Sequence, residues 1–243
     1  MATWNCCSQL EQFLQSLTKQ SWTDWELLLL DNASEDGTAE LVADFQASLL
    51  DGVQKVIWSS QPDSGIYEAW NRGLTLARGE YLCFVGADDT FVQQDSLRMI
   101  AELSSTNAEL ITGRNDYYNK HGRFLRSWGY DWRWGRMRQS MNIAHPGMLI
   151  SRQLFITLGV YDQSFCICGD YEWLLRLPRH LRTVHTSDSI LKIIQAGVSH
   201  TRITKVYAET YRAQSRYIGS LPSASYRIIN WLKYVRRRVI GLA

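Results

Sequence analysis

The chain has 243 residues, of which 45% are hydrophobic and 21% charged, so it can bury one sizeable core and is not intrinsically disordered. Its net charge of +2 is unevenly spread: residues 201–243 contain nine Lys and Arg side chains and one acid, Glu209, whereas residues 1–200 contain 17 basic and 23 acidic side chains. The acidic body excludes a typical nucleic-acid-binding protein, and the basic tail favours contact with an anionic surface.

Residues 1–90 alternate between helical and strand patterns. Ser8 and Glu11 form a capping-box pattern before apolar residues at helical spacing, which predicts a helix of about three turns. The other expected elements are strands at 25–30, 56–58 and 81–85, a turn at 31–38, and helices at 41–49 and 65–77. This alternation predicts an α/β fold with a doubly wound, mostly parallel sheet.

The second half of the chain is less regular. Residues 130–136 are dense in aromatic and basic side chains and have no clean period, so we expect a loop there. The other expected elements are strands at 109–113, 123–128 and 148–151, a short helix at 170–177, and helix from residue 201 onward. We predict one domain over residues 1–200 and a helical basic tail over residues 201–243.

Acidic side chains follow two of the predicted strands. Asp31 follows the strand at 25–30, and Asp88 and Asp89 follow the strand at 81–85. Ligands of open α/β sheets bind beyond the carboxyl ends of the strands, so these acids are expected at one rim. Two adjacent carboxylates can hold a hard divalent cation that offsets the charge of a departing diphosphate. On spacing alone, however, a helix cap or a solvated turn explains the Asp88-Asp89 pair better.

Three segments, in order, resemble those of inverting family-2 glycosyltransferases, in the branch that builds bacterial polysaccharides such as colanic acid. Residues 31–38 resemble the D-G-S-S-x-D-G-T turn of that family. Residues 62–73 resemble its P-D-x-G-I-Y-D-A-M-N-K-G segment, and residues 79–89 resemble its G-E-Y-I-x-F-L-x-x-D-D segment. The resemblance implies a GT-A-like fold, with a nucleotide-sugar half at 1–90 and an acceptor half at 91–200.

The resemblance also implies roles for individual residues. Substrate-binding positions are Thr3 and Asn5 at the nucleotide site, Asp31 at the base, Asp63 in the nucleotide pocket, Asp88 at the ribose or sugar, His145 on the acceptor side, and Gly65 and Asn71 in the second segment. Asp89 would bind Mg²⁺ or Mn²⁺, and Asp170 would be the general base. From the residues themselves, Asp170 could equally be a helix cap, Glu172 is a rival base, and a lone histidine such as His145 is more often structural.

The implied enzyme is a hexosyltransferase-type glycosyltransferase. It would move a sugar from a UDP- or GDP-sugar to a hydroxyl of a glycan or lipid-linked acceptor, with inversion and metal-assisted departure of the diphosphate. The sequence departs from the family at Met1, because most of the usual first strand is missing or truncated. A non-catalytic protein of the same fold that binds nucleotide sugars or glycans therefore stays as the alternative.

The remaining features concern the compartment. The five cysteines form no C-x-x-C pair, so reduced thiols are expected in place of disulfides or a zinc site. Residues 1–5 lack the features of a signal peptide, and no apolar run approaches the roughly 20 residues of a membrane span. We expect a cytoplasmic protein, with residues 226–243 either packed on the domain or lying on the inner face of the membrane as a basic amphipathic helix.

Deleting residues 226–243 is expected to release the protein from anionic liposomes if this helix lies in the membrane interface, because the deletion removes both apolar and basic groups. Co-sedimentation of the full-length and shortened chains measures the effect. Unchanged binding would contradict the membrane interpretation.

Overall fold

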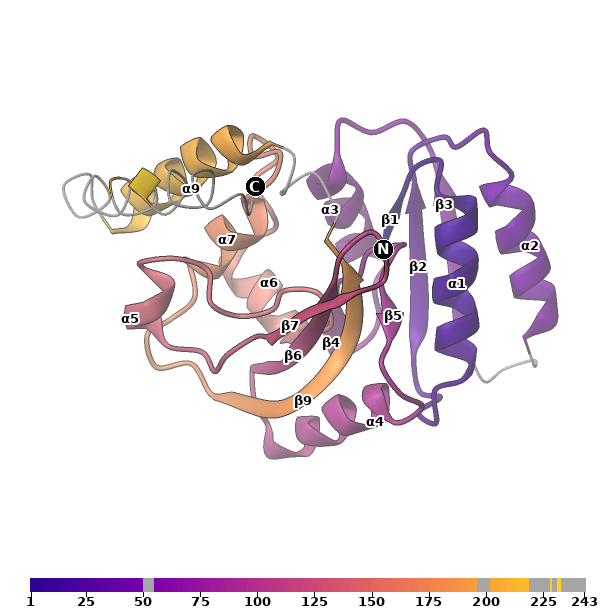
Figure 1. The fold of residues 1–243 in the computed structure, drawn as a ribbon, viewed down its shortest axis with the longest axis horizontal. Helices are drawn as coiled ribbons and strands as arrows, with labels where there is room; N and C mark the ends of the chain where they lie inside the picture. Colours follow the sequence, from indigo (N-terminus) through magenta and orange to yellow (C-terminus); the bar gives the residue numbers. More distant parts are fainter. Residues whose placement is uncertain (50–54, 196–201, 219–227, 229–230, 233–243) are drawn as a thin grey trace.

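A computed structural model describes residues 1–49, 55–195, 202–218, 228 and 231–232. The first part of the chain forms a three-stranded sheet with helices around it (Figure 1). Its elements are β1 (Ala2–Thr3), α1 (Cys7–Thr18), β2 (Glu26–Asp31), α2 (Thr38–Ser48), β3 (Lys55–Ser60) and α3 (Ile66–Leu76). The strand order is β1-β2-β3 and both pairings are parallel, as expected for the first half of an α/β fold.

The second part of the chain builds a mixed sheet in the order β4-β8-β6-β9-β5, with β7 paired to β6. Only β6 and β9 pair in parallel, and the other four pairings are antiparallel. Its elements are β4 (Tyr81–Cys83), β5 (Thr90–Phe91), α4 (Ser96–Ala101), η1 (Glu102–Thr106), β6 (Leu110–Tyr118), β7 (Phe124–Trp128), α5 (Trp134–Met137), β8 (Leu149–Ser151), α6 (Arg152–Leu158), α7 (Gly169–Leu174), β9 (Thr183–Ile194) and α9 (Ile203–Tyr217). The α/β class is confirmed, with parallel pairing concentrated in the first sheet.

Hydrophobic spacing predicted the elements of the first half well, whereas the cap of α1 was predicted wrongly. The i, i+3, i+4, i+7 residues of α1 are buried, as amphipathic spacing requires: Leu10, Phe13, Leu14 and Leu17. Ser8 lies inside the first turn, and the N-cap is Cys6, which makes no side-chain cap. Asp36 supplies the missing acceptor, since its Oδ2 atom lies 2.9 Å from the backbone nitrogen of Cys7. A carboxylate distant in sequence thus replaces the local capping box.

Two other predictions for the second half were incomplete. The expected loop at 130–136 contains the start of α5, a single turn of helix. Strand β9 was not predicted, although it has 12 residues and pairs with β6. Most of β9 is only half-buried and its polar residues interrupt any alternation, so hydrophobic periodicity gave no signal.

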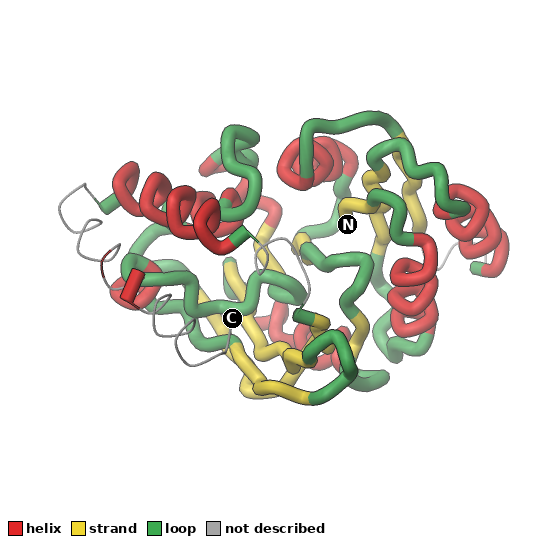
Figure 2. Tube along the Cα trace, turned by 45° about the horizontal axis from the view of Figure 1, so that its top comes forward, coloured by secondary structure: helices red, strands yellow, loops and turns green. Residues whose placement is uncertain are grey.

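Figure 2 shows α9 beside the second half of the molecule, and the helical prediction for the tail is confirmed for its residues 203–217. Ile228, Trp231 and Leu232 are 61%, 58% and 54% exposed, and the rest of the segment 226–243 lies outside the described residues. Within the described part of the chain, no helix is long and apolar enough to cross a bilayer. All five cysteines are free thiols.

A gap separates β2 from β4. The expected truncated first strand is present as β1, which pairs only with Leu30 and Asp31 of β2. A cavity of about 890 Å³ lies beyond this short pairing and is lined by Met1 and by residues of β2, α3 and β4. The Met1 amino group donates to the carbonyl oxygen of Leu28 at 2.8 Å, and burial lowers its pKa to about 5, which favours the neutral amine at neutral pH. This amine occupies the position that a peptide N–H would take in a parallel ladder.

Fusing four β-branched apolar residues ahead of Met1 is expected to stabilise the fold, because they would extend β1 along β2, fill part of the cavity and replace the buried amine by an amide. A gain of roughly 2 kcal/mol, the order for burying one aliphatic side chain, would raise Tm by about 4–8 °C in a chain of this size. A Gly-Ser extension of equal length is the control, since it replaces the amine by an amide without filling the cavity. Equal Tm values for the two extensions would contradict strand formation in the gap.

Candidate functional site

The Asp31 carboxylate ties together the ends of the first three strands. Asp31 is fully buried at the end of β2 and accepts hydrogen bonds from the Thr3 hydroxyl (3.0 Å) and the Ser60 hydroxyl (2.8 Å). It also accepts from the backbone nitrogen and the hydroxyl of Ser34, at 2.8 and 2.6 Å. Four donors fill the four lone-pair sites of a carboxylate. Asp31 thus organises the rim, and direct contact with a nucleotide base would require it to exchange one of these partners.

Asn5 fastens the β1–α1 connection to the turn after β2. Its backbone nitrogen donates to the Ser34 hydroxyl at 2.8 Å, and its Oδ1 accepts from the backbone nitrogen of Glu35 at 2.9 Å. Its φ of 44° lies in the left-handed region, which asparagine tolerates better than most residues. The structure therefore brings Asn5 and Thr3 to the same turn as Asp31, and the nucleotide-binding roles that the resemblance implies for the three residues stay predictions.

Asp63 lies beside this turn, because its backbone nitrogen donates to Oδ1 of Asn32 at 2.8 Å. Its own Oδ1 accepts from the backbone nitrogen of Gly65 at 3.0 Å, and Oδ2 is 3.9 Å from the Arg72 guanidinium. Burial raises the pKa of Asp63, while the Gly65 amide and the Arg72 charge act in the opposite direction. Nε and Nη1 of Arg72 are buried without a hydrogen-bond partner, so this cation keeps unused donors next to the rim.

Gly65 and Gly73 at the two ends of α3 serve different purposes. Gly65 precedes the helix with a φ of 143°, and an added Cβ would meet nothing within 4 Å. Its requirement is therefore conformational. A Cβ at Gly73 would lie 3.1 Å from a methyl group of Leu30, so Gly73 allows α3 to pack closely on β2.

Asp88 and Asp89 follow β4 and differ sharply in environment. Asp88 is exposed, whereas Asp89 is 3% exposed and accepts one hydrogen bond, from the backbone nitrogen of Gly86 at 2.7 Å. Burial raises the pKa of Asp89 to about 7, and the neighbouring Asp88 adds to the increase. A Cβ at Gly86 would lie 2.8 Å from Asp88 Oδ1 and 3.2 Å from Asp89 Oδ2, so both carboxylates converge over this glycine.

The thiol of Cys6 lies near acids of both segments. Burial raises the pKa of Cys6, and the charges of Asp36, Asp31 and Asp88 raise it further. Asp31, at the end of β2, and Asp88, after β4, therefore both act on this thiol, although β2 and β4 belong to separate sheets and not to the single sheet that the sequence predicted.

The paired carboxylates suit a hard divalent cation. Asp88 and Asp89 offer the oxygen ligands that Mg²⁺ and Mn²⁺ prefer, and the buried carboxylate of Asp89 has a single protein hydrogen bond. The described residues contain no group of three or more His, Cys, Asp or Glu side chains that could enclose a metal ion. Such a cation would therefore complete its shell with substrate oxygens and water, which is usual for Mg²⁺.

Asp170 lies in the first turn of α7, on the other side of α3. Its Oδ1 accepts from the backbone nitrogen of Tyr171 at 2.8 Å and lies 3.3 Å from the Tyr67 hydroxyl. That hydroxyl donates to the carbonyl oxygen of Ile167 at 2.7 Å and accepts from the backbone nitrogens of Gly169 and Asp170 at 2.8 and 3.2 Å. Because Tyr67 and Arg72 both belong to α3, this helix connects Asp170 with the acidic rim.

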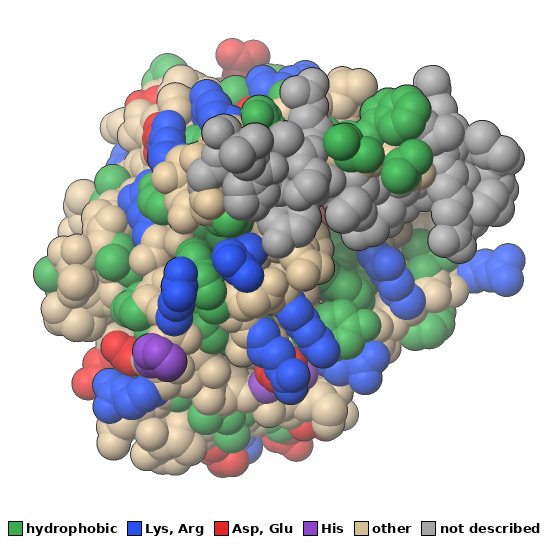
Figure 3. Space-filling model, turned by 90° about the vertical axis from the view of Figure 1, so that its left-hand side faces the viewer, with side chains coloured by type: hydrophobic (Ala, Val, Ile, Leu, Met, Phe, Trp, Pro, Cys, Tyr) green, Lys and Arg blue, Asp and Glu red, His purple; other side chains and the backbone are tan. Residues whose placement is uncertain are grey.

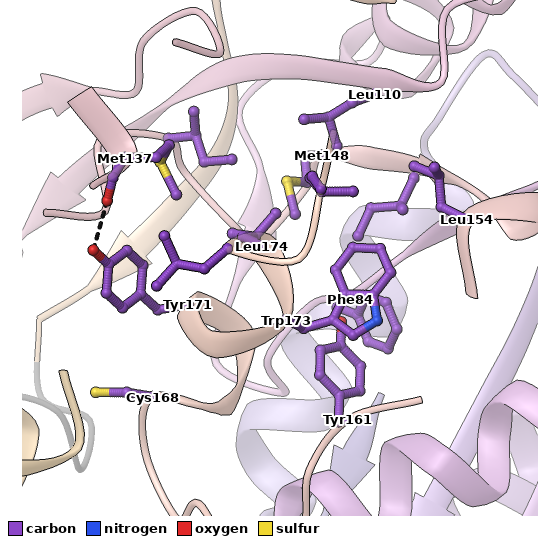
Figure 4. Packing of buried hydrophobic residues seen from close by; sticks show 14 of the residues in the cluster. Phe84, Leu110, Met137, Met148, Leu154, Tyr161, Cys168, Tyr171, Trp173 and Leu174 are labelled. Carbon is purple, nitrogen blue, oxygen red and sulfur yellow. Dashed lines mark hydrogen bonds between the residues drawn. The ribbon is translucent and has the colours of Figure 1, made fainter. Parts of the chain in front are cut away.

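His145 belongs to an aromatic cluster near Asp170. It is 4% exposed, stacks on Trp70 with ring centroids 5.4 Å apart, and has Nε2 3.3 Å from the Tyr161 hydroxyl. Burial lowers its pKa, although the charge of Asp170 acts in the opposite direction. Tyr161 and Phe84 of this cluster pack beside Trp173 in Figure 4. These surroundings favour a neutral imidazole that supports the wall of the site.

Asn71 joins α3 to the segment after α6. Its Nδ2 donates to the carbonyl oxygen of Tyr161 at 2.8 Å, and its Oδ1 accepts from the Tyr161 backbone nitrogen at 2.9 Å. This two-bond pairing holds the aromatic cluster against α3. The role of Asn71 in the structure is therefore to position the aromatic cluster, and the substrate-binding role that the resemblance implies stays a prediction.

The surroundings of Glu172 do not suit a general base. Glu172 is fully buried, pairs with Arg176 at 2.5 Å and Arg216 at 3.2 Å, and accepts from the Tyr217 hydroxyl at 2.5 Å. A carboxylate that is paired with two cations and excluded from solvent is a structural anion. Asp170 is therefore the acid of this motif that retains partial exposure.

Three residues that shape the site had no predicted role: Tyr67, Ser60 and Glu209. Tyr67 lies inside the second family-like segment, and Glu209 is the single acid of residues 201–243, so both carried a signal. Ser60 carried none, because only the pairing of β2 with β3 brings it opposite Asp31.

Two kinds of comparison place the chain among known proteins. The sequence model described as Glycosyl transferase family 2 matches residues 1–166. A PGL/p-HBAD biosynthesis glycosyltransferase of Mycobacterium tuberculosis (strain ATCC 25177 / H37Ra) is 31% identical, over 98% of this chain and 91% of that protein. Glycosyltransferase AglE of Haloferax volcanii is 26% identical, over 71% of this chain and 58% of that protein.

Solved structures share the fold. S. aureus TarS 1–349 in complex with UDP-GlcNAc superposes with a TM-score of 0.70 and 18% identity, covering 93% of this chain and 67% of that one. Mannosyltransferase PcManGT from Pyrobaculum calidifontis, in complex with GDP-Man and Mn²⁺, gives a TM-score of 0.65 and 15% identity, covering 98% and 73%. The match of the family model, the 31% identical relative and the acidic rim agree: this chain belongs to glycosyl transferase family 2 and is a glycosyltransferase.

Proposed function

We propose that this enzyme transfers a sugar from a UDP- or GDP-sugar to a hydroxyl group of a glycan or lipid-linked acceptor, with inversion at the anomeric carbon. The observation that carries the proposal is the set of acids that follow the strands, with Asp31 ending β2, Asp63 following β3 and Asp88 and Asp89 following β4, while Tyr67 of α3 contacts Asp170. The nucleotide complexes of TarS and PcManGT, which have the same fold, support a nucleoside diphosphate sugar as donor.

On the donor side, the turn held by Asp31 and the segment around Asp63 would form the nucleotide pocket. Arg72 contributes unused buried donors there, which can bond the uracil or guanine edge or a ribose oxygen. Exposed Asp88 would bond ribose or sugar hydroxyls, and Asp89 would hold Mg²⁺ or Mn²⁺. The bound cation would supply positive charge that offsets the charge developing on the diphosphate as it leaves.

On the acceptor side, Asp170 would act as the general base. Because Oδ1 is engaged by the backbone nitrogen of Tyr171, we assign Oδ2 as the atom that takes the proton of the acceptor hydroxyl. The oxygen attacks the anomeric carbon while the bond to the diphosphate breaks on the opposite face. A single displacement of this kind inverts the configuration.

The segment from residue 120 to residue 136 carries an exposed set of basic and apolar side chains. Figure 3 shows Lys and Arg side chains together with apolar side chains on the left-hand side of the molecule as drawn in Figure 1. The exposed basic residues of this region are Lys120, Arg123, Arg126, Arg133 and Arg136, with exposed Phe124, Leu125 and Tyr130 among them. Basic and apolar groups on one surface suit an anionic lipid-linked acceptor or the surface of the inner membrane, in keeping with the earlier proposal for residues 226–243.

Asp89→Asn tests the metal site through stability as well as activity. In the protein without metal, a pKa raised from 3.8 to about 7 means that ionising Asp89 costs stability as pH rises through this window. We expect Asp89→Asn to be more stable than the wild type at pH 8, by no more than about 4 kcal/mol, and equally stable below pH 4.

Metal and nucleotide should reverse this order, because a cation favours the ionised carboxylate. Wild-type Tm at pH 8 is expected to rise with Mn²⁺ plus UDP or GDP, and the Asp89→Asn Tm is expected to stay unchanged. The same Tm measurement over a set of nucleoside diphosphates and their sugars, with and without Mn²⁺, also identifies which nucleotide the donor carries. Equal Mn²⁺-dependent shifts in the two proteins would contradict the role of Asp89.

Asp170→Asn tests the base. We expect sugar transfer to fall by about 10²–10⁴-fold, the usual contribution of a general base, while Mn²⁺-dependent binding of UDP or GDP is retained. Release of the nucleotide from a UDP- or GDP-sugar measures turnover. Asp44→Asn, at an exposed position of α2, is the matched control and should behave as the wild type. Full turnover by Asp170→Asn would exclude Asp170 as the base.

A further inference from the structure

The carboxylate of Glu209 holds the loop that precedes Asp170. Glu209 lies in α9 and is 7% exposed. Its oxygens accept from three successive backbone nitrogens: Cys166 at 3.0 and 3.1 Å, Ile167 at 2.8 Å and Cys168 at 2.9 Å. Hydrogen bonds to an ionised acceptor are about twice as strong as neutral ones, and these end two residues before Asp170.

Tyr67 holds the same loop from the opposite side. Its hydroxyl bonds the carbonyl oxygen of Ile167 and the backbone nitrogens of Gly169 and Asp170. A Cβ at Gly169 would lie 2.8 Å from the Tyr67 ring, so only glycine allows this approach without a shift. The backbone from 166 to 170 is thus fixed between a carboxylate of α9 and a phenol of α3.

Other residues of α9 fix the helix that carries Asp170. Nε2 of Gln214 lies 3.2 Å from the Tyr171 hydroxyl and 3.0 Å from the carbonyl oxygen of Arg138. The Tyr171 hydroxyl in turn donates to the carbonyl oxygen of Met137, the dashed contact in Figure 4. The buried Glu172 pairs with Arg216 of α9. Residues of α9 therefore bond the loop just before α7 and the two residues that follow Asp170, Tyr171 and Glu172.

We propose that Glu209 is a positioning residue for Asp170, and that α9 is the part of the tail that sets the direction of the base. This inference rests on the proposed role of Asp170. The bonds of Glu209, Gln214 and Arg216 go to the Asp170 side of the molecule: to the loop 166–168, to Tyr171 and to Glu172. Loss of the Glu209 carboxylate should therefore impair transfer while leaving nucleotide binding intact.

The test compares Glu209→Gln with Lys205→Gln. Both variants remove one charge from α9 and introduce the same side chain, but Lys205 is exposed. For Glu209→Gln we expect turnover of UDP- or GDP-sugar to fall by about 100-fold, the order that a misplacement near 1 Å can cause. Its Mn²⁺-dependent affinity for UDP or GDP should change less than twofold. Lys205→Gln should match the wild type in both measurements.

Hydrogen exchange gives a readout without catalysis. The amides of residues 166–168 are expected to lose protection in Glu209→Gln and to keep it in Lys205→Gln. If Glu209→Gln does not fold, Glu209→Asp serves the same purpose, because its shorter carboxylate reaches fewer of the three amides. Lost protection with wild-type turnover in either variant would overturn the positioning role.

Asp170→Asn separates the two proposals. If Asp170→Asn is inactive and Glu209→Gln is fully active, the base stands and the positioning inference is wrong. If Asp170→Asn is fully active, the role of the base itself is wrong, whatever Glu209→Gln does.

Discussion

Burying a carboxylate is costly unless hydrogen-bond donors surround it, and this constraint organises the whole molecule. Asp31 meets the constraint with donors from Thr3, Ser34 and Ser60, so the ends of β1, β2 and β3 cannot separate without exposing an unpaired charge. Glu209 meets it with three backbone nitrogens and thereby fixes a loop. In each case, one buried charge holds together segments that are distant in sequence.

Asp89 is the exception, and it is the residue that we propose to bind the cation. It is as buried as these acids but receives only the Gly86 amide, and its pKa is accordingly raised to about 7. A group left under-satisfied in the free protein is available to a ligand of opposite charge, and perturbed pKa values gather at functional sites for this reason. The stability lost at Asp89 is what a cation would recover on binding.

Helix α3 contacts both the turn around Asp31 and the loop before Asp170. Gly73 lets it pack on β2, Arg72 borders the Asp31 rim, and Tyr67 grips the loop before Asp170. Glu209 of α9 holds the same loop by accepting hydrogen bonds from its backbone nitrogens. A tail that composition alone describes as a basic appendage is, over residues 203–217, part of the support of the proposed base.

The sequence by itself determined the elements of the first half and the position of the acids after β2 and β4, because apolar periodicity and turn chemistry are local. It could not find β9, the Asp36 cap of α1, or the partners of Asp31, since each depends on residues brought together by the fold. The sequence left Asp170 and Glu172 as rival bases. Only the tertiary structure separated them, by burying Glu172 among Arg176, Arg216 and Tyr217 while Asp170 kept partial access to solvent.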